Sequence, residues 1–93
     1  AWIHCFAAGC AIIAGCVTGL SPIEWIAIVF AIAMVLAAEA VNSSIEALAD
    51  LVSPGYNEAI KRTKDLAAGA VLILAIGAAT IGCIIFLPKF LAL

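Results

Sequence analysis

The chain has 93 residues, enough for one domain, with 68% hydrophobic residues and a mean hydropathy of +1.33. This composition is far more apolar than that of soluble domains and predicts an integral membrane protein of the all-α class. A net charge of −2 provides no basic surface for nucleic acid, so we exclude a nucleic-acid partner.

Three apolar segments predict three transmembrane helices in a single domain, at about residues 2–17, 23–52 and 65–87. The first span is shorter than the usual length of about 20 residues. Because the sequence also starts inside an apolar run and without Met, we expect the natural protein to begin earlier. His4 lies near the start of this span and is interpreted as an interfacial residue without a chemical role.

The second span has several helix-start signals that agree. Ser21 is the predicted N-cap, Pro22 the first helical residue, and Glu24 the partner of Ser21 in a capping box. The helix that follows should be about 45 Å long, whereas a hydrocarbon core is about 30 Å thick. Its C-terminal part must therefore emerge from the membrane before Pro54 ends it.

A polar connection is predicted at 56–64, before the third span at 65–87. It carries the only cluster of positive charge in the chain, Lys61, Arg62 and Lys64. By the positive-inside rule this connection is cytoplasmic. Pro88 is predicted to end the third span.

The last third of the second helix carries a polar stripe on one face. At 100° per residue, its members fall within an arc of about 100°. Carboxylates gathered in this way repel one another unless a cation, a proton or a partner intervenes. Some of them can bind Mg²⁺ together with nucleotide phosphates, while another can take a proton from a hydroxyl group. The stripe consists of Glu39, Asn42, Ser43, Glu46 and Asp50.

Two readings without kinase chemistry compete with this interpretation. In the first, the stripe is a solvated helix end that packs in an oligomer; in the second, the chain is an ion-coupled membrane transport subunit. Such subunits use one carboxylate near the middle of the bilayer, whereas these carboxylates stack toward the end of the helix and next to a basic connection. We therefore favour a phosphate donor that arrives from water.

The stripe resembles the signature of a known family. The pattern E-x-x-N-S-x-I-E-x-x-x-D over residues 39–50, followed by K-D at 64–65, is similar to that of the prokaryotic diacylglycerol kinases, small lipid kinases with three spans. The resemblance covers essentially the whole chain. The segments L-V-S-P at 51–54 and F-L-P-K at 86–89 look more like the branch that phosphorylates undecaprenol than the branch that phosphorylates diacylglycerol.

This resemblance implies a homotrimer in the bacterial plasma membrane, with active sites shared between subunits on the cytoplasmic side, and a reaction that uses ATP and Mg²⁺. Glu39 would be the general base on the lipid hydroxyl, Asn42 would support it, and Glu46 would hold the metal. This division also suits the chain itself, because Glu39 is the deepest carboxylate and Glu46 lies nearer the water. The nucleotide would be contacted by Glu46, Asp50, Gly55, Tyr56, Asn57, Lys64 and Asp65.

The family also has an amphipathic surface helix before the first span. That helix ends in a Glu which shares the metal with the position that matches Glu46. The segment is missing from this sequence, so we expect the natural protein to carry it. A smaller departure is Asn57, where the family usually has His.

Overall fold

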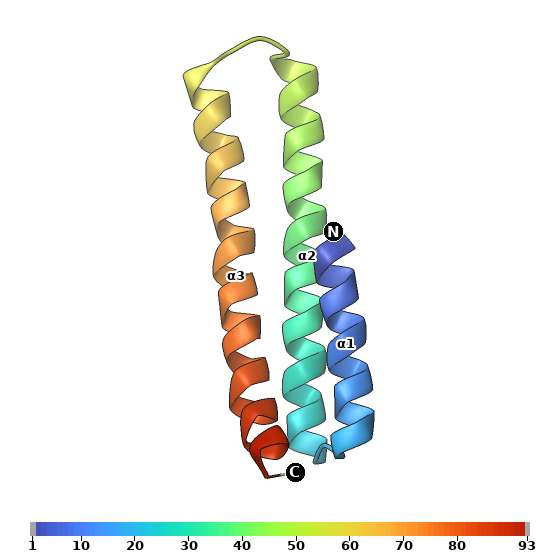
Figure 1. Cartoon of the computed structure of the whole chain (residues 1–93). Helices are drawn as coiled ribbons and strands as arrows, with labels where there is room; N and C mark the ends of the chain where they lie inside the picture. The colour runs from blue at the N-terminus through green and yellow to red at the C-terminus, as the bar shows by residue number, and fades with distance from the viewer. Residues whose placement is uncertain (1, 93) are drawn as a thin grey trace.

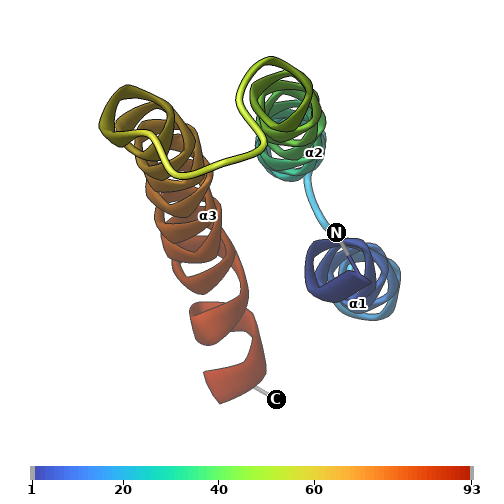
Figure 2. The ribbon, with the colours of Figure 1, turned by 90° about the horizontal axis from the view of Figure 1, so that it is seen from above.

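A computed structural model describes residues 2–92, which form three helices and no strand: α1 (Trp2–Thr18), α2 (Pro22–Val52) and α3 (Glu58–Leu91). The long helices α2 and α3 run antiparallel, and α1 lies beside the lower part of α2 (Figure 1). Seen from above, the three helices occupy the corners of a triangle (Figure 2). The bundle measures 54 × 19 × 16 Å, so it is long and thin.

The surface of this bundle is apolar. Large side chains face outward along all three helices; Phe6, Phe30 and Ile73, for example, are 75%, 63% and 71% exposed. A soluble monomer does not expose hydrophobic surface on this scale. Both α2 and α3 are long and apolar enough to cross a membrane, whereas α1, with 17 residues, is shorter. The chain is therefore an all-α membrane protein, as predicted.

The turn between α1 and α2 has the predicted local structure. Gly19 adopts a positive φ of 73°, which costs glycine little, and its N–H donates to the Gly15 carbonyl (2.9 Å). The Ser21 N–H then donates to the Glu24 carboxylate (3.0 Å), while the Ser21 hydroxyl accepts from the Glu24 N–H (3.3 Å). The capping box at the start of α2 is confirmed.

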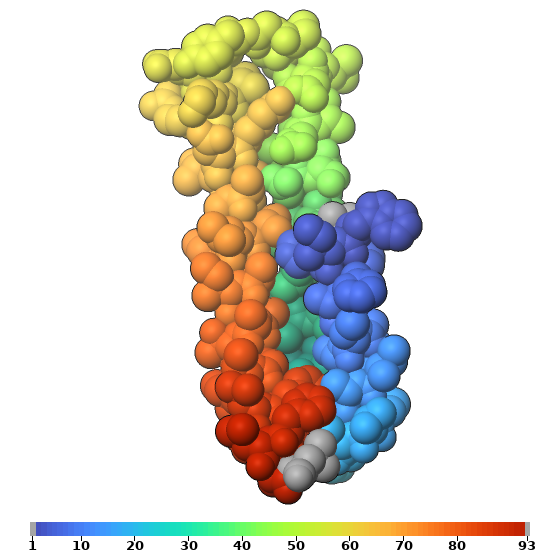
Figure 3. Space-filling view, in the orientation of Figure 1, coloured from blue at the N-terminus to red at the C-terminus, as the bar shows by residue number. Residues whose placement is uncertain are grey.

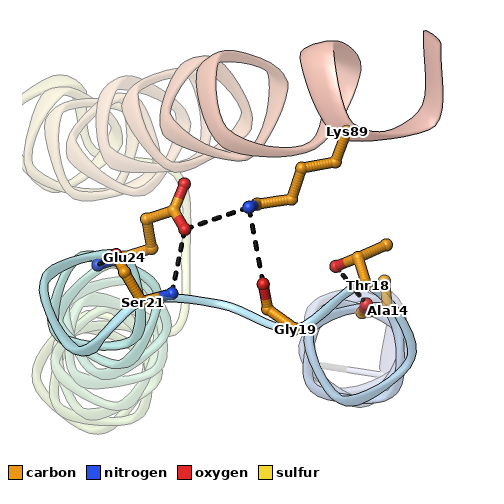
Figure 4. A network of polar contacts seen from close by, with 6 residues as sticks. All are labelled: Ala14, Thr18, Gly19, Ser21, Glu24 and Lys89. Carbon is orange, nitrogen blue, oxygen red and sulfur yellow. Dashed lines mark hydrogen bonds and ion pairs between the residues drawn. The ribbon is translucent and has the colours of Figure 1, made fainter. Parts of the chain in front are cut away.

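The end of α3 is attached to this turn by Lys89 (Figure 4). Its ammonium group lies 3.1 Å from Glu24 Oε1 and donates to the carbonyl of Gly19 at 3.4 Å. Glu24 therefore has two partners, the cap of its own helix and the last turn of α3. This contact holds the lower end of the bundle together.

Helix α3 continues past Pro88, where the uncharged third span is expected to end, and reaches Leu91. Proline removes one helical hydrogen bond and normally breaks a helix. Here Lys89, in the last turn of α3, pairs with Glu24 on α2. The rings of Phe86 and Phe90, one turn apart on either side of Pro88, have centroids 6.1 Å apart. The ion pair between Lys89 and Glu24 thus supports a last helical turn at a position where proline alone would favour a helix end.

The connection between α2 and α3 is also shorter than predicted. Helix α2 ends at Val52 as expected, but α3 already begins at Glu58. The Asn57 side chain caps α3, because its Oδ1 accepts from the N–H groups of Ala59 (2.9 Å) and Ile60 (3.2 Å). The basic residues predicted in a loop therefore lie on the first turns of a helix.

Gly15 is the one buried residue of α1, and it lies against the turn and the start of α2. A Cβ atom at this position would come within 2.7 Å of the Trp25 ring and 2.9 Å of Leu20. The bare backbone of Gly15 thus makes room for Trp25.

We expect Gly15→Ala to lower the melting temperature of the protein in detergent micelles. Alanine is favoured over glycine within a helix by about 1 kcal/mol, but overpacking typically costs about 1–3 kcal/mol. Gly9→Ala is the matched control, because no described atom lies within 4 Å of a Cβ at Gly9. Equal melting temperatures for the two variants would contradict the packing at Gly15.

Candidate functional site

The polar stripe begins at Glu39, level with the start of α1, and continues along the part of α2 that faces α3 (Figure 1). Exposure increases along the stripe: the side chain of Glu39 is 13% exposed and that of Asp50 is 66% exposed. Asn42 is partly buried, whereas Ser43 and Glu46 are exposed. The stripe therefore leads from a shielded carboxylate to carboxylates that water can reach.

Glu39 contacts a residue that the sequence analysis set aside. The Nδ1 atom of His4, on α1, lies against Oε1 of Glu39, and both atoms are buried. His4 had been interpreted as an interfacial residue without chemistry. The signal that could have pointed to it is the short turn at Gly19, since antiparallel helices joined by such a turn place the start of the first helix beside the middle of the second, although the turn does not specify which residues meet.

Asn42 lies one turn beyond Glu39 toward the exposed end of the stripe. Its side-chain oxygen is buried and accepts no hydrogen bond from any residue that the structure describes. Buried polar atoms almost always have a partner. Asn42 thus offers an acceptor beside Glu39.

Asp50 links the stripe to α3. The Lys64 ammonium group donates to Asp50 Oδ1 at 2.5 Å. Lys64 lies in the polar first turns of α3, outside the uncharged segment 66–87. The hydrogen bond with Asp50 raises the pKa of Lys64 despite some loss of hydration, and the negative charges of Asp50 and Glu46 act in the same direction. The cation therefore stays charged at the edge of the stripe.

The other predicted nucleotide residues lie further from the stripe. Asp65 pairs with Lys61 on its own helix, at 2.9 Å. Gly55 and Tyr56 are exposed in the connection, and the Asn57 side chain is engaged in capping α3. Of the nucleotide residues predicted beyond α2, Lys64 alone forms an ion pair with the stripe in the described part of the chain.

Within residues 2–92 the structure shows no metal centre built from three or more protein side chains. No group of three or more His, Cys, Asp or Glu side chains lies close enough to hold an ion there. Mg²⁺ in nucleotide sites is commonly held by one or two carboxylates together with phosphates and water. The exposed carboxylate of Glu46 fits one such ligand.

An apolar cavity of about 510 Å³ runs between the three helices below the stripe. In the space-filling view it is a groove between α1 and α3 with α2 as its floor (Figure 3). His4 lines it near Glu39, and Phe86 and Phe90 line it near the opposite end of the bundle. Most of the remaining lining is alanine and branched aliphatic side chains. The groove is thus wide, apolar and adjacent to the most shielded carboxylate.

Comparison with known proteins gives a consistent result. A family model described as prokaryotic diacylglycerol kinase matches residues 1–86. The undecaprenol kinase of Bacillus subtilis is 40% identical over 92% of this chain and 70% of its own length. The diacylglycerol kinase of Synechocystis is 36% identical over 98% of this chain and 53% of its own length. The Escherichia coli diacylglycerol kinase is 31% identical over 86% of this chain and 66% of its own length.

These matches cover nearly all of the chain, although the chain spans only about half to two thirds of the two diacylglycerol kinases. They favour a kinase over an ion-coupled transport subunit, and they agree with the pattern of the stripe. The chain belongs to the prokaryotic diacylglycerol kinase family, a family of membrane lipid kinases.

Proposed function

We propose that this lipid kinase transfers the γ-phosphate of Mg-ATP to the hydroxyl group of undecaprenol, with diacylglycerol as the alternative acceptor. The observation that carries the proposal is the position of Glu39. This carboxylate lies next to an apolar groove on one side, and the stripe leads from it toward exposed carboxylates and Lys64 on the other. A lipid hydroxyl and a water-borne nucleotide can meet only where such surfaces adjoin.

In this proposal the hydroxyl oxygen of the lipid forms a bond to the γ-phosphorus of ATP. Glu39 takes the proton that this hydroxyl group loses. The bond from that phosphorus to the β-phosphate oxygen breaks, and ADP leaves. Asn42 supports the reacting groups, and Lys64 attracts the phosphates. Bound Mg²⁺, held in part by Glu46, would neutralise phosphate charge. The protein otherwise contributes mainly position and charge, which is what phosphoryl transfer requires.

The sidedness and assembly follow the same reasoning. The basic residues at the start of α3 support a cytoplasmic location for the stripe in the bacterial plasma membrane. A homotrimer with shared sites is implied by the resemblance to the family, and the exposed apolar faces of the helices agree with it. A neighbouring subunit would then add contacts to the nucleotide and the metal.

The acceptor can be identified with radiolabelled ATP. Purified protein in lipid vesicles is expected to label undecaprenol faster than diacylglycerol at equal concentrations, since the undecaprenol kinase of Bacillus subtilis is more similar to this chain than the two diacylglycerol kinases compared above. Thin-layer separation of the products measures both rates. A preference for diacylglycerol would support the alternative acceptor, and the absence of any labelled lipid would contradict the proposed reaction.

The two carboxylates are expected to act differently when each is changed to glutamine. Glu39→Gln should lower kcat by at least about 100-fold while the affinity for Mg-ATP stays nearly unchanged, because only the base is lost. Glu46→Gln should weaken Mg-ATP binding. Nucleotide titration and steady-state rates on both variants measure these effects, and an equal loss of binding in both would refute the assignment.

Lys64 is expected to matter more for ATP than its neighbour Arg62. Lys64→Gln should raise the KM for ATP roughly tenfold, because a charged hydrogen bond to phosphate is lost. Arg62→Gln removes the same charge two residues earlier, where no ion pair forms among the described residues, and serves as the control. A similar KM in both variants would show that Lys64 acts only through the general positive charge.

A further inference from the structure

We propose that His4 is a positioning residue for Glu39, and that α1 takes part in the reaction through it. The inference rests on the proposed role of Glu39 as the base. It comes from one contact, between His4 Nδ1 on α1 and Glu39 Oε1 on α2, in which both atoms are buried. The two helices meet at this pair near the upper end of the groove.

The chemistry of the two groups determines the direction of the interaction. For His4 to orient Glu39 as an ionised base, the imidazole must carry the proton on Nδ1, because a carboxylate only accepts hydrogen bonds. A hydrogen bond to one oxygen limits the rotation of the carboxylate about its last bond. His4 therefore selects one orientation of the base.

The surroundings give this contact a large effect. The side chain of Glu39 is 13% exposed, and that of His4 is 31% exposed, so water screens the pair only weakly. On α2 the polar neighbours are Asn42 and, a turn further, Glu46; α3 contributes no charged side chain over 66–87. His4 is thus the charged or titratable side chain that α1 brings to the base.

His4 also lines the apolar groove, on the side of α1. A lipid whose chain lies in the groove, with its hydroxyl group at Glu39, would contact the imidazole of His4. The same side chain therefore limits both where the base points and where the alcohol approaches. Misplacement of reacting groups by about 1 Å can cost about 100-fold in rate.

The test compares three substitutions that differ in where an N–H lies. His4→Leu removes the donor, His4→Asn places an amide N–H on the same branch point as Nδ1, and His4→Gln moves it one bond further out. We expect His4→Leu and His4→Gln to lower kcat by about tenfold to 100-fold, with the KM for ATP unchanged. His4→Asn should recover most of the wild-type kcat.

Melting temperatures of all three variants, and the activity of Glu39→Gln, are measured in parallel. Wild-type kcat in His4→Leu, or an equal loss in all three variants together with a lower melting temperature, would overturn the positioning role. An active Glu39→Gln would instead refute the proposed function on which the inference rests. An inactive Glu39→Gln beside a fully active His4→Leu refutes the positioning role alone.

Discussion

The cost of placing charge in hydrocarbon explains where nearly all the charged side chains of the described residues lie. Residues 26–38 of α2 and 66–87 of α3 are free of charge, and the charged side chains gather at the two ends of the bundle. Glu39 is the exception, because it lies at the border of the apolar part of α2 and is largely shielded. Shielding a carboxylate from water costs free energy of hydration. The proposed role of Glu39 as the base explains why a carboxylate lies at this position.

The same constraint explains how the long helices keep their register. Helices α2 and α3 are joined at one end by Glu24 and Lys89 and at the other by Asp50 and Lys64. Such surface pairs contribute little stability individually. Between them the contacts are apolar and specify register weakly, so the paired ends align the two helices. Helix α1 lines one side of the groove below the stripe.

Local signals in the sequence predicted local structure well. Ser21, Pro22 and Glu24 predicted the start of α2, because all the atoms of a capping box lie within one turn. Asn57 carried an equally local signal for the start of α3, but the polar residues after it were interpreted as a loop. The helical turn past Pro88 was not predictable for a different reason: the contact that supports it involves Lys89 and Glu24, which are far apart in the sequence.

In the candidate site, too, the features within one helix were predictable and the contacts between helices were not. The face shared by Glu39, Asn42, Glu46 and Asp50 follows from helical geometry alone, and so it was predictable. The pairing of Glu39 with His4 depends on how α1 packs against α2, which no periodicity in either helix specifies. The roles assigned to these residues remain proposals that the resemblance to the family supports.

In the proposed reaction, the lipid hydroxyl meets Glu39 at the top of the groove. Solid-state NMR can test it in membranes with an acceptor lipid labelled with ¹³C at the carbinol carbon, protein labelled at the Glu side-chain carboxyls, and a non-hydrolysable ATP analogue with Mg²⁺. The account predicts a dipolar contact from the carbinol carbon to the Glu39 carboxyl, consistent with a hydrogen bond of about 2.6–3.2 Å between heavy atoms, that disappears in Glu39→Gln. A contact to Glu46 instead, or one that persists without the Glu39 carboxylate, would contradict it.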